Sequence, residues 1–465
     1  MKQRILSCLL AVLLSLSAMA EVKYVFYFIG DGMGVNQINV TETYLAALKG
    51  KIGFEPLLMS SLPVVGMVNT YSATNGVTDS AAGGTALATG KKTKNGAIGV
   101  LKDLETPCYS IAQWAKNSGK AVGVATSVAV THATPASFFG HQADRNMYWE
   151  LGKDLCKSNF DFFGGSDFHT PYTKEGEPSL HEQAKAAGYT IVKGYKEYMK
   201  KGRQAEKLCL FQSDKANEKL GSDQIPYALD RTKDDLTLEQ IVRAGINFLS
   251  SKNTDGFFFE VEGGMIDWAC HSNDAATVIG EVQEFDKAIQ VVYDFYKKHP
   301  KETLIIITAD HETGGMALGN KKYTLDLQLL QNQKVSVGKL SDEIKALQEQ
   351  YGKKLKWEQV KDLLQKEVGL YDAVPVKSEE DAELQQLFKH MLNNKAKDEK
   401  TLYAEVSALA AKAIKLLNKK AHVGWTTTSH SAAAVPVFAI GQGAELFTGW
   451  HDNSEVMPLI LKATN

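Results

Sequence analysis

The chain has 465 residues, of which 44% are hydrophobic and 23% charged, as in an ordinary folded globular protein. Its formal charge of −2 gives no electrostatic reason to expect nucleic acid or an anionic membrane as the main partner. The length would suit two or three domains of average size, although large single α/β domains are also common.

The first twenty residues have the pattern of a signal peptide. Lys2 and Arg4 precede an apolar run from Ile5 to Leu16, and Ala18-Met19-Ala20 follows as a cleavage sequence. We therefore expect cleavage before Glu21 and export to the periplasm or the medium. A membrane anchor is the alternative, but the run is short for a bilayer and no other long apolar stretch occurs.

Four cysteines remain after the leader, and an even number permits up to two disulfides in an oxidising compartment. They are Cys108, Cys156, Cys209 and Cys270. Four cysteines allow three pairings, and the sequence does not choose between them. Their spacings do not resemble a zinc knuckle.

Five short apolar runs, rich in β-branched or aromatic residues, predict strands that are buried on both faces, as in a covered parallel sheet. The runs are Tyr24–Ile29, Ala121–Thr126, Gly256–Val261, Thr303–Thr308 and Val435–Ile440. Helical patterns separate them, and the clearest spans Ala275 to Lys298 with apolar residues at spacings of three and four. This alternation predicts an α/β fold with a central, mostly parallel sheet sandwiched by helices.

The composition changes between about residues 321 and 420, where Lys, Glu, Gln and Leu dominate. Ser341–Leu347 and Trp357–Leu364 are typical of amphipathic surface helices, the first with Ser341 as its N-cap. We interpret 21–465 as one α/β domain with a helix-rich insertion at about 321–420. The insertion is either a solvated decoration without chemistry, a lid or a dimer contact.

Six polar segments lie at the ends of apolar runs or at helix starts. They are Gly30-Asp31-Gly32-Met33-Gly34, Thr78–Ala86, His132-Ala133-Thr134-Pro135, Glu262–Asp267 with His271, Asp310-His311-Glu312 and Ser429-His430. In open α/β sheets, ligands bind beyond the carboxyl ends of the strands. A fold that collects these segments places carboxylates and imidazoles around one hydroxyl, which is the composition of a two-zinc site with a serine nucleophile.

Ser80 is the candidate nucleophile because it precedes a stretch of small residues that predicts a helix start, where an anion is favoured. The alternative is that Asp79 or Ser80 is merely an N-cap. Asp267 and His271 are four residues apart and share one helix face, so they can hold one ion, although a simple helix ion pair has the same spacing. Cys270 lies on a different face of such a helix, so we predict no metal bond for it; a disulfide and a buried thiol both remain open.

In these motifs the chain resembles the alkaline phosphatases. The similarity covers most of Tyr24 to Asn320 and continues from about Trp425, in the family's order. It implies that Ser80 is the nucleophile and that two zinc ions and one magnesium-type ion are bound. The implied ligands are Asp267, His271 and His430 for one zinc, Asp31, Asp310 and His311 with Ser80 for the other, and Asp31, Thr134 and Glu262 for the third ion.

The resemblance also implies that Arg145 clamps phosphate oxygens, although taken alone it would be interpreted as a surface arginine. Two residues depart from the best-known bacterial pattern. His132 replaces an aspartate of the third metal site, and Trp268 replaces a lysine near phosphate. We therefore expect modest magnesium affinity and weak inhibition by free phosphate.

The implied activity is hydrolysis of phosphate monoesters to alcohol and inorganic phosphate through a phosphoserine, by a homodimer without a membrane anchor. The nearest alternatives are a phosphodiesterase or a sulfatase of the same superfamily. Sulfatases need a Cys/Ser-x-Pro-x-Arg motif, which Ser80 lacks. A non-catalytic zinc- or phosphate-binding protein is the alternative from another class.

Overall fold

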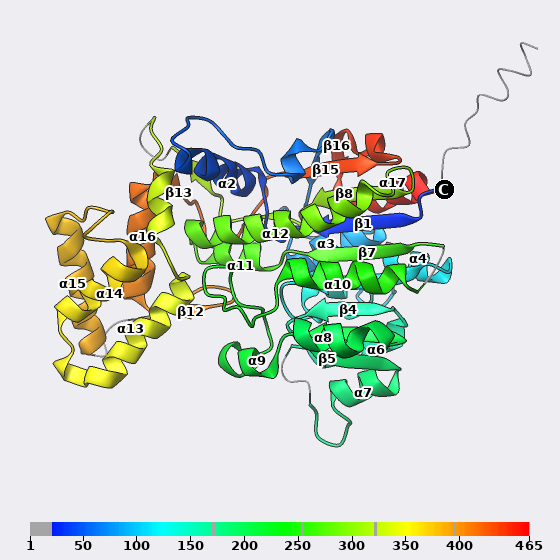
Figure 1. Cartoon of the computed structure of the whole chain (residues 1–465), viewed down its shortest axis with the longest axis horizontal. Helices are drawn as coiled ribbons and strands as arrows, with labels where there is room; N and C mark the ends of the chain where they lie inside the picture. Colours follow the sequence, from blue (N-terminus) through cyan, green and yellow to red (C-terminus); the bar gives the residue numbers. More distant parts are fainter. Residues whose placement is uncertain (1–20, 170–172, 253–254, 320–322, 394–396, 465) are drawn as a thin grey trace, which may run out of the picture.

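The computed structural model describes residues 21–169, 173–252, 255–319, 323–393 and 397–464; the predicted signal peptide, 1–20, lies outside the described residues. A ten-stranded sheet forms its centre (Figure 1). Its strands, in spatial order, are β16 (Gly449–Asp452), β2 (Val64–Asn69), β15 (Val435–Gly441), β8 (Thr303–Thr308), β1 (Tyr24–Ile29), β7 (Phe257–Glu262), β3 (Ala121–Thr126), β4 (Phe162–Gly165), β6 (Lys207–Phe211) and β5 (Tyr189–Lys193).

The middle strands end at the same level. β1 pairs in parallel with β7 and β8, so that Ile29 at its end lies opposite Glu262 and Thr308. Residues that directly follow these three strands therefore meet at one edge of the sheet. β15 is the one strand of this sheet that runs antiparallel to its neighbours, β2 and β8.

All five predicted strands are present, with ends shifted by one residue in β7 and β15. The expectation of a parallel strand at β15 was wrong, because an apolar run that is buried on both faces looks the same in either direction. β2 was not among the predicted strands, although Val64 to Val68 form an apolar run; only two of its six residues are buried.

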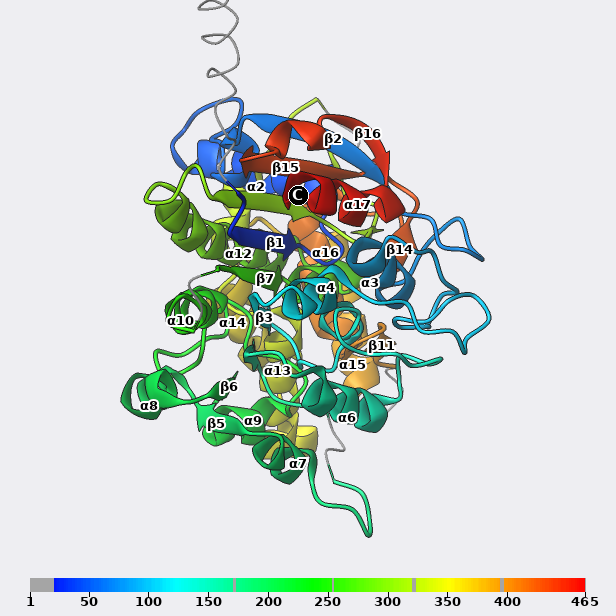
Figure 2. The same cartoon turned by 90° about the vertical axis from the view of Figure 1, so that its right-hand side faces the viewer.

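Helices cover both faces of the sheet. Figure 2 shows α10 and α12 on one side and α3, α4 and α17 on the other. The helices around the sheet are α2 (Val35–Leu48), α3 (Ser80–Thr89), α4 (Ile111–Asn117), α5 (Ala133–Ala136), α6 (Tyr148–Ser158), α7 (Leu180–Ala186), α8 (Tyr195–Lys201), α9 (Asp214–Leu220), α10 (Leu238–Ser250), α11 (Met265–His271), α12 (Ala275–Tyr296) and α17 (Asn453–Thr464). None of the helices in the described ranges is both long and apolar enough to cross a bilayer.

The predicted helix-rich segment forms a separate group of helices beyond the carboxyl ends of the central strands, drawn in yellow and orange in Figure 1. Its helices are α13 (Val337–Tyr351), α14 (Trp357–Val368), α15 (Ser378–Leu392) and α16 (Ala408–Lys420). Three two-stranded ribbons accompany it and the site: β10 (Ala317–Leu318) with β13 (Val423–Gly424), β11 (Glu399–Lys400) with β12 (Glu405–Val406), and β9 (Glu312–Thr313) with β14 (His430–Ser431).

The predicted N-cap of the first of these helices was wrong. Ser336, not Ser341, caps α13 by accepting a hydrogen bond from the Lys339 backbone N–H. Ser341 is buried one turn inside the helix, where its hydroxyl accepts from the Ser407 backbone N–H at 2.8 Å. The permitted disulfides are not present, since all four cysteines of the described chain are free.

Asp274 connects the helical group to the sheet domain. It is 1% exposed and caps α12, accepting from the Thr277 N–H at 3.2 Å. Its carboxylate also accepts from the Gln333 amide and from the Val337 N–H at the start of α13, both at 2.8 Å. One buried side chain thus satisfies three donors from two parts of the structure.

Replacing this side chain should destabilise the fold. Asp274→Ala leaves buried donors without an acceptor, which should cost about 2–4 kcal/mol in the free energy of unfolding. Urea denaturation measures the change. Asp342→Ala, on the exposed face of α13, is the matched control and should stay within about 0.5 kcal/mol of the wild type. Equal stability of the two variants would show that Asp274 does not join the two parts.

Candidate active site

Carboxylates from three neighbouring strands meet at the edge of the sheet. Asp31 follows β1, Glu262 ends β7, and Asp310 follows β8. The loop after β1 is held against the loop after β8, because the Gly32 backbone N–H donates to Asp310 Oδ1 at 3.3 Å. Asp267 lies on α11, directly after β7.

Position 32 requires a glycine, both because of its backbone conformation and because neighbouring side chains leave no room for a Cβ. Its φ is +68°, in the left-handed region that disfavours side chains. A Cβ there would lie 2.8 Å from Asp267 Oδ1 and 2.8 Å from Thr313 Oγ1. The absence of a side chain at this position therefore lets Asp267 approach the loop after β1.

Ser80 is the first residue of α3 and is 1% exposed. Its Oγ lies 3.2 Å from His311 Nε2, which brings the start of α3 to the end of β8. Asp79 is the N-cap, as the simpler interpretation proposed, and its Oδ1 accepts from the Ala82 N–H at 3.0 Å. A Cβ on Gly83 would lie 2.9 Å from the Asp310 carbonyl, so the small residues bring the helix against the strand end.

The imidazoles of His271 and His430 each have their proton position fixed. His271 Nδ1 lies 2.5 Å from the Thr428 carbonyl, and His430 Nδ1 lies 2.9 Å from the Thr78 carbonyl. A carbonyl only accepts, so both Nδ1 atoms carry the hydrogen and both Nε2 atoms present a lone pair. These two Nε2 atoms are only 3.2 Å apart.

His311 is oriented in the same sense by Thr313. The Thr313 hydroxyl donates to Asp267 Oδ1 at 2.5 Å and therefore accepts from His311 Nδ1 at 3.2 Å. The Nε2 lone pair of His311 then faces Asp310 Oδ2 at 3.3 Å and Asp31 Oδ1 at 3.4 Å. A lone pair that faces two carboxylates is repelled by both unless a cation lies between them.

Other acceptor atoms of the site also face one another without a hydrogen between them. Asp31 Oδ1, Asp267 Oδ2 and Asp310 Oδ2 are buried and have no hydrogen-bond partner in the described chain. Asp267 lies 3.3 Å from His271 Nε2 and 3.7 Å from His430 Nε2. Carboxylate oxygens and imidazole lone pairs thus converge on the same buried space without hydrogens between them. Such a space fits divalent cations, and this combination of histidine and carboxylate ligands suits zinc.

The donor atoms of two groups of residues converge, and within each group they lie within 4.8 Å of one another. One group is Asp267, His311 and His430, and the other is Asp31, Asp310 and His311. The sequence assigned His271 rather than His311 to the first set. His271 Nε2 also lies close to Asp267 and to His430, so all six predicted zinc ligands are together.

Burial and neighbouring negative charges shift the pKa values of the acidic groups. Burial, with Asp267 nearby, raises the pKa of Asp310 to about 8, and burial raises that of Glu262 to about 7. Burial and three neighbouring carboxylates also raise the pKa of Asp31.

The residues predicted for a third ion also converge. The Thr134 hydroxyl donates to Asp31 Oδ2 at 3.2 Å, and the Thr126 hydroxyl donates to Glu262 Oε2. His132 lies at the start of α5, and its buried Nε2 has no hydrogen-bond partner in the described chain. Burial lowers the pKa of His132 well below its usual value, so it adds a neutral group to this region.

Arg145 belongs to the site and is not a surface arginine. Its Nη1 donates to Asp79 Oδ2 at 3.0 Å, which places the guanidinium beside the residue that precedes Ser80. It lines a cavity of about 510 Å³ together with His132, Trp268 and Tyr403. A second cavity, of about 430 Å³, opens over His271 and His430.

Among the residues that contact the predicted set and that sequence reasoning missed are Thr313 and Tyr403. Thr313 orients His311 and Asp267, and Tyr403 contacts Arg145. A threonine next to Asp310-His311-Glu312 could have been noticed, since metal-binding histidines usually donate their other ring nitrogen to a partner. Tyr403 lies in the helix-rich segment, outside the stretches that carry the family resemblance, and had no local signal.

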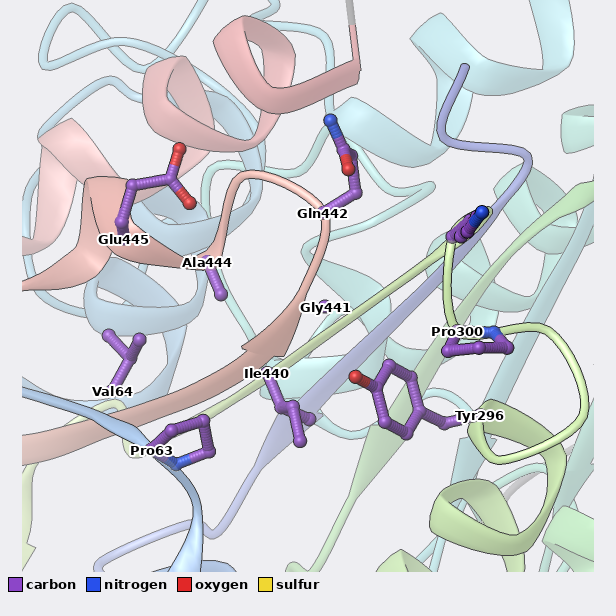
Figure 3. Close-up of a pocket in the computed structure, with 10 residues that line it drawn as sticks. Pro63, Val64, Tyr296, Pro300, Ile440, Gly441, Gln442, Ala444 and Glu445 are labelled. Carbon is purple, nitrogen blue, oxygen red and sulfur yellow. The ribbon is translucent and has the colours of Figure 1, made fainter. Parts of the chain in front are cut away.

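Figure 3 shows a further pocket, of about 400 Å³, lined by Pro63, Val64, Tyr296, Ile440 and Glu445 among others. It lies at the amino-terminal end of β8, because Gly441 pairs with Leu304 there. It is therefore at the opposite end of the strand from the metal-site residues and shares none of them.

The model of the alkaline phosphatase family matches residues 22–465. The chain is 32% identical to alkaline phosphatase 3 of Bacillus subtilis over 95% of this chain and 89% of that protein. The crystal structure of a cold-active alkaline phosphatase from Shewanella sp. superposes with a TM-score of 0.79, with 30% identity over 95% of this chain and 100% of that chain.

A third relative is the alkaline phosphatase of the Antarctic bacterium TAB5, in a variant with a histidine replaced by aspartate and Mg bound in its M3 site. It has a TM-score of 0.65 and 26% identity, over 96% of this chain and 99% of that chain. The family match over nearly the whole chain agrees with the converging donor clusters of the site. The chain belongs to the alkaline phosphatase family and is a metal-dependent enzyme that hydrolyses phosphate monoesters.

Proposed function

We propose that hydrolysis proceeds through a covalent phosphoserine on Ser80. The observation that carries this proposal is the position of Ser80 Oγ, which is buried at the start of α3 and lies 3.2 Å from His311 Nε2. A helix N-terminus favours the negative charge that develops on an attacking oxygen.

The proposal assigns two zinc ions and one magnesium-type ion to the converging donors. Asp267, His271 and His430 hold one zinc, and Asp31, Asp310 and His311 hold the other. Asp31, Thr134 and Glu262 hold the third ion. When bound, these ions supply positive charge that neutralises the phosphoryl oxygens and favours the ionised form of the serine hydroxyl.

The side chains then have separate tasks. Arg145, fixed by Asp79, binds two oxygens of the phosphoryl group and orients it toward Ser80. Ser80 Oγ forms a bond to phosphorus while the bond to the alcohol oxygen breaks, and the alcohol leaves with a proton. Water then attacks the phosphoserine, which releases inorganic phosphate and restores the hydroxyl.

The proposal also includes export after cleavage before Glu21, one α/β domain with a helix-rich insertion, and assembly as a homodimer. The leader pattern of residues 1–20 supports export. The N-terminal sequence of the exported protein and its mass by light scattering test these points; a retained leader or a monomeric mass would contradict them.

The first prediction from this mechanism concerns the nucleophile. Ser80→Ala should lower turnover by several powers of ten, because the covalent route is lost, while the zinc content stays at the wild-type level. Incubation of the wild type with labelled phosphate at acid pH, followed by peptide mapping, should place the label on Ser80. Label on another residue would overturn the assignment.

The second prediction concerns the metal-free protein, whose stability should fall as the pH rises. Glu262 and Asp310 have folded pKa values of about 7 and 8, against about 4 in an unfolded chain. The folded state therefore holds more protons between those limits, and unfolding becomes easier through that window.

Melting temperatures of chelator-treated protein between pH 5 and pH 9 measure this effect. Zinc should raise the melting temperature most at the alkaline end, because the metal replaces the protons there. A metal-free protein that is equally stable at both ends of the range would refute the buried-carboxylate explanation.

A third prediction concerns the two departures from the common pattern. Trp268→Lys should strengthen inhibition by phosphate, since an ammonium adds charge where indole offers one neutral donor. His132→Asp should raise magnesium affinity, because it supplies a hard anionic oxygen; the TAB5 variants with Mg bound are consistent with this. Inhibition constants and metal titrations are the measurements. Phosphate inhibition that is unchanged by Trp268→Lys, both in the otherwise wild-type enzyme and in a Tyr403→Phe background, would refute contact with product.

A further inference from the structure

We infer that Tyr403, which the helical segment contributes, is a positioning residue of the active site that holds Arg145 in its phosphate-binding orientation. The inference rests on the proposed role of Arg145 as the phosphate clamp. It assigns a task in the reaction to a segment that would otherwise be a solvated decoration.

A tight turn carries Tyr403 to the site. β11 and β12 pair antiparallel, and the turn between them closes with a hydrogen bond from the Thr401 N–H to the Ala404 carbonyl at 2.8 Å. Leu402 at the tip is 61% exposed and borders the cavity beside Arg145, and the next side chain, Tyr403, also lines that cavity. The turn thus brings both residues to the site, and Tyr403 is the one whose side chain contacts Arg145.

Stacking fixes the plane of the tyrosine ring. The Tyr403 and Trp268 rings lie 4.4 Å apart at an angle of 9°, and the edge of His271 approaches at 5.4 Å and 73°. Aromatic contacts of this kind stabilise one ring orientation. Since the ring is planar, that orientation also determines where the hydroxyl lies.

The hydroxyl meets the guanidinium of Arg145. Arg145 Nη2 donates to Tyr403 Oη at 3.1 Å, while Nη1 donates to Asp79 Oδ2 at 3.0 Å. One contact on each terminal nitrogen fixes the plane of the group from two sides. Three of the five N–H groups of an arginine then remain for phosphate oxygens.

The preorganised guanidinium is expected to bind phosphate more tightly than a mobile one, because less side-chain freedom is lost on binding. Asp79 supplies this restraint from the nucleophile helix and Tyr403 from the helical segment. The two anchors are 324 positions apart in the sequence, by subtraction of their residue numbers.

The test removes the hydroxyl and keeps the ring. In the zinc-loaded, full-length enzyme, Tyr403→Phe should raise both the Kd for inorganic phosphate, measured by calorimetry, and KM about three- to tenfold, which lies within the usual range for the net contribution of one hydrogen bond. The melting temperature should fall by no more than it does in the control variant Tyr371→Phe. Tyr403→Ala should raise Kd and KM further, because the stacking is lost as well.

Tyr371→Phe is the matched control within the same helical segment. It removes a hydroxyl that hydrogen-bonds to Asp381 at 2.7 Å, far along the chain from the site residues. It should lower the melting temperature and leave the phosphate Kd unchanged. A phosphate Kd that rises equally in both tyrosine variants would mean that general loosening of the segment is responsible, and the inference would be wrong.

A double-mutant cycle with Arg145→Ala separates this inference from the proposed function. The inference predicts that Tyr403→Phe has no further effect on phosphate binding once Arg145 is absent. Additive effects, or a normal Kd in Tyr403→Phe beside a weakened one in Arg145→Ala, would overturn the inference and leave the clamp intact. A normal Kd in Arg145→Ala would instead overturn the proposed role of Arg145.

Discussion

Negative charge is concentrated in this active site where little water can reach it. Asp31, Glu262, Asp267 and Asp310 are each 5% exposed or less, and three of their oxygens have no hydrogen-bond partner in the described chain. Unpaired carboxylates in such surroundings either take up protons or attract cations. The structure favours cations, because the adjacent imidazoles already donate their hydrogens elsewhere and present lone pairs to the same space. The metal ions that take part in the reaction are thus also expected to stabilise the folded state, because they neutralise its buried carboxylates.

The groups that orient these ligands come from distant parts of the chain. His430 is fixed by the carbonyl of Thr78, 352 positions away, and that carbonyl lies two residues before Ser80. Thr313 links His311 to Asp267 and so joins the end of β8 to α11. The His311–Thr313 contact is local, but the other two join segments that are 46 and 352 positions apart, so the site can assemble only when the sheet has brought its strand ends together. Folding and site formation are therefore expected to be cooperative.

The sequence predicts the strands well because a buried strand needs a continuous apolar run, as in Tyr24–Ile29 and Thr303–Thr308. It does not predict strand direction, and β15 shows why, since an apolar run carries no direction. The residues predicted as zinc ligands, which lie together in the structure, were proposed because carboxylates and histidines follow such runs and match a known family. Tyr403 was not found, because one tyrosine in a segment rich in Lys and Glu has no pattern, and its role depends on a tertiary contact with Arg145.

Trp268 and Tyr403 are best understood as one unit. A lysine at position 268, as in the common bacterial pattern, would place a second cation near Arg145 and would leave the tyrosine ring without its stacking partner. The indole supplies that partner at 4.4 Å, and the tyrosine in turn supplies a neutral acceptor to the guanidinium. The effect of a change at residue 268 therefore combines a charge near phosphate with the orientation of Arg145. The two contributions have opposite signs, since added positive charge strengthens phosphate binding and a less ordered guanidinium weakens it.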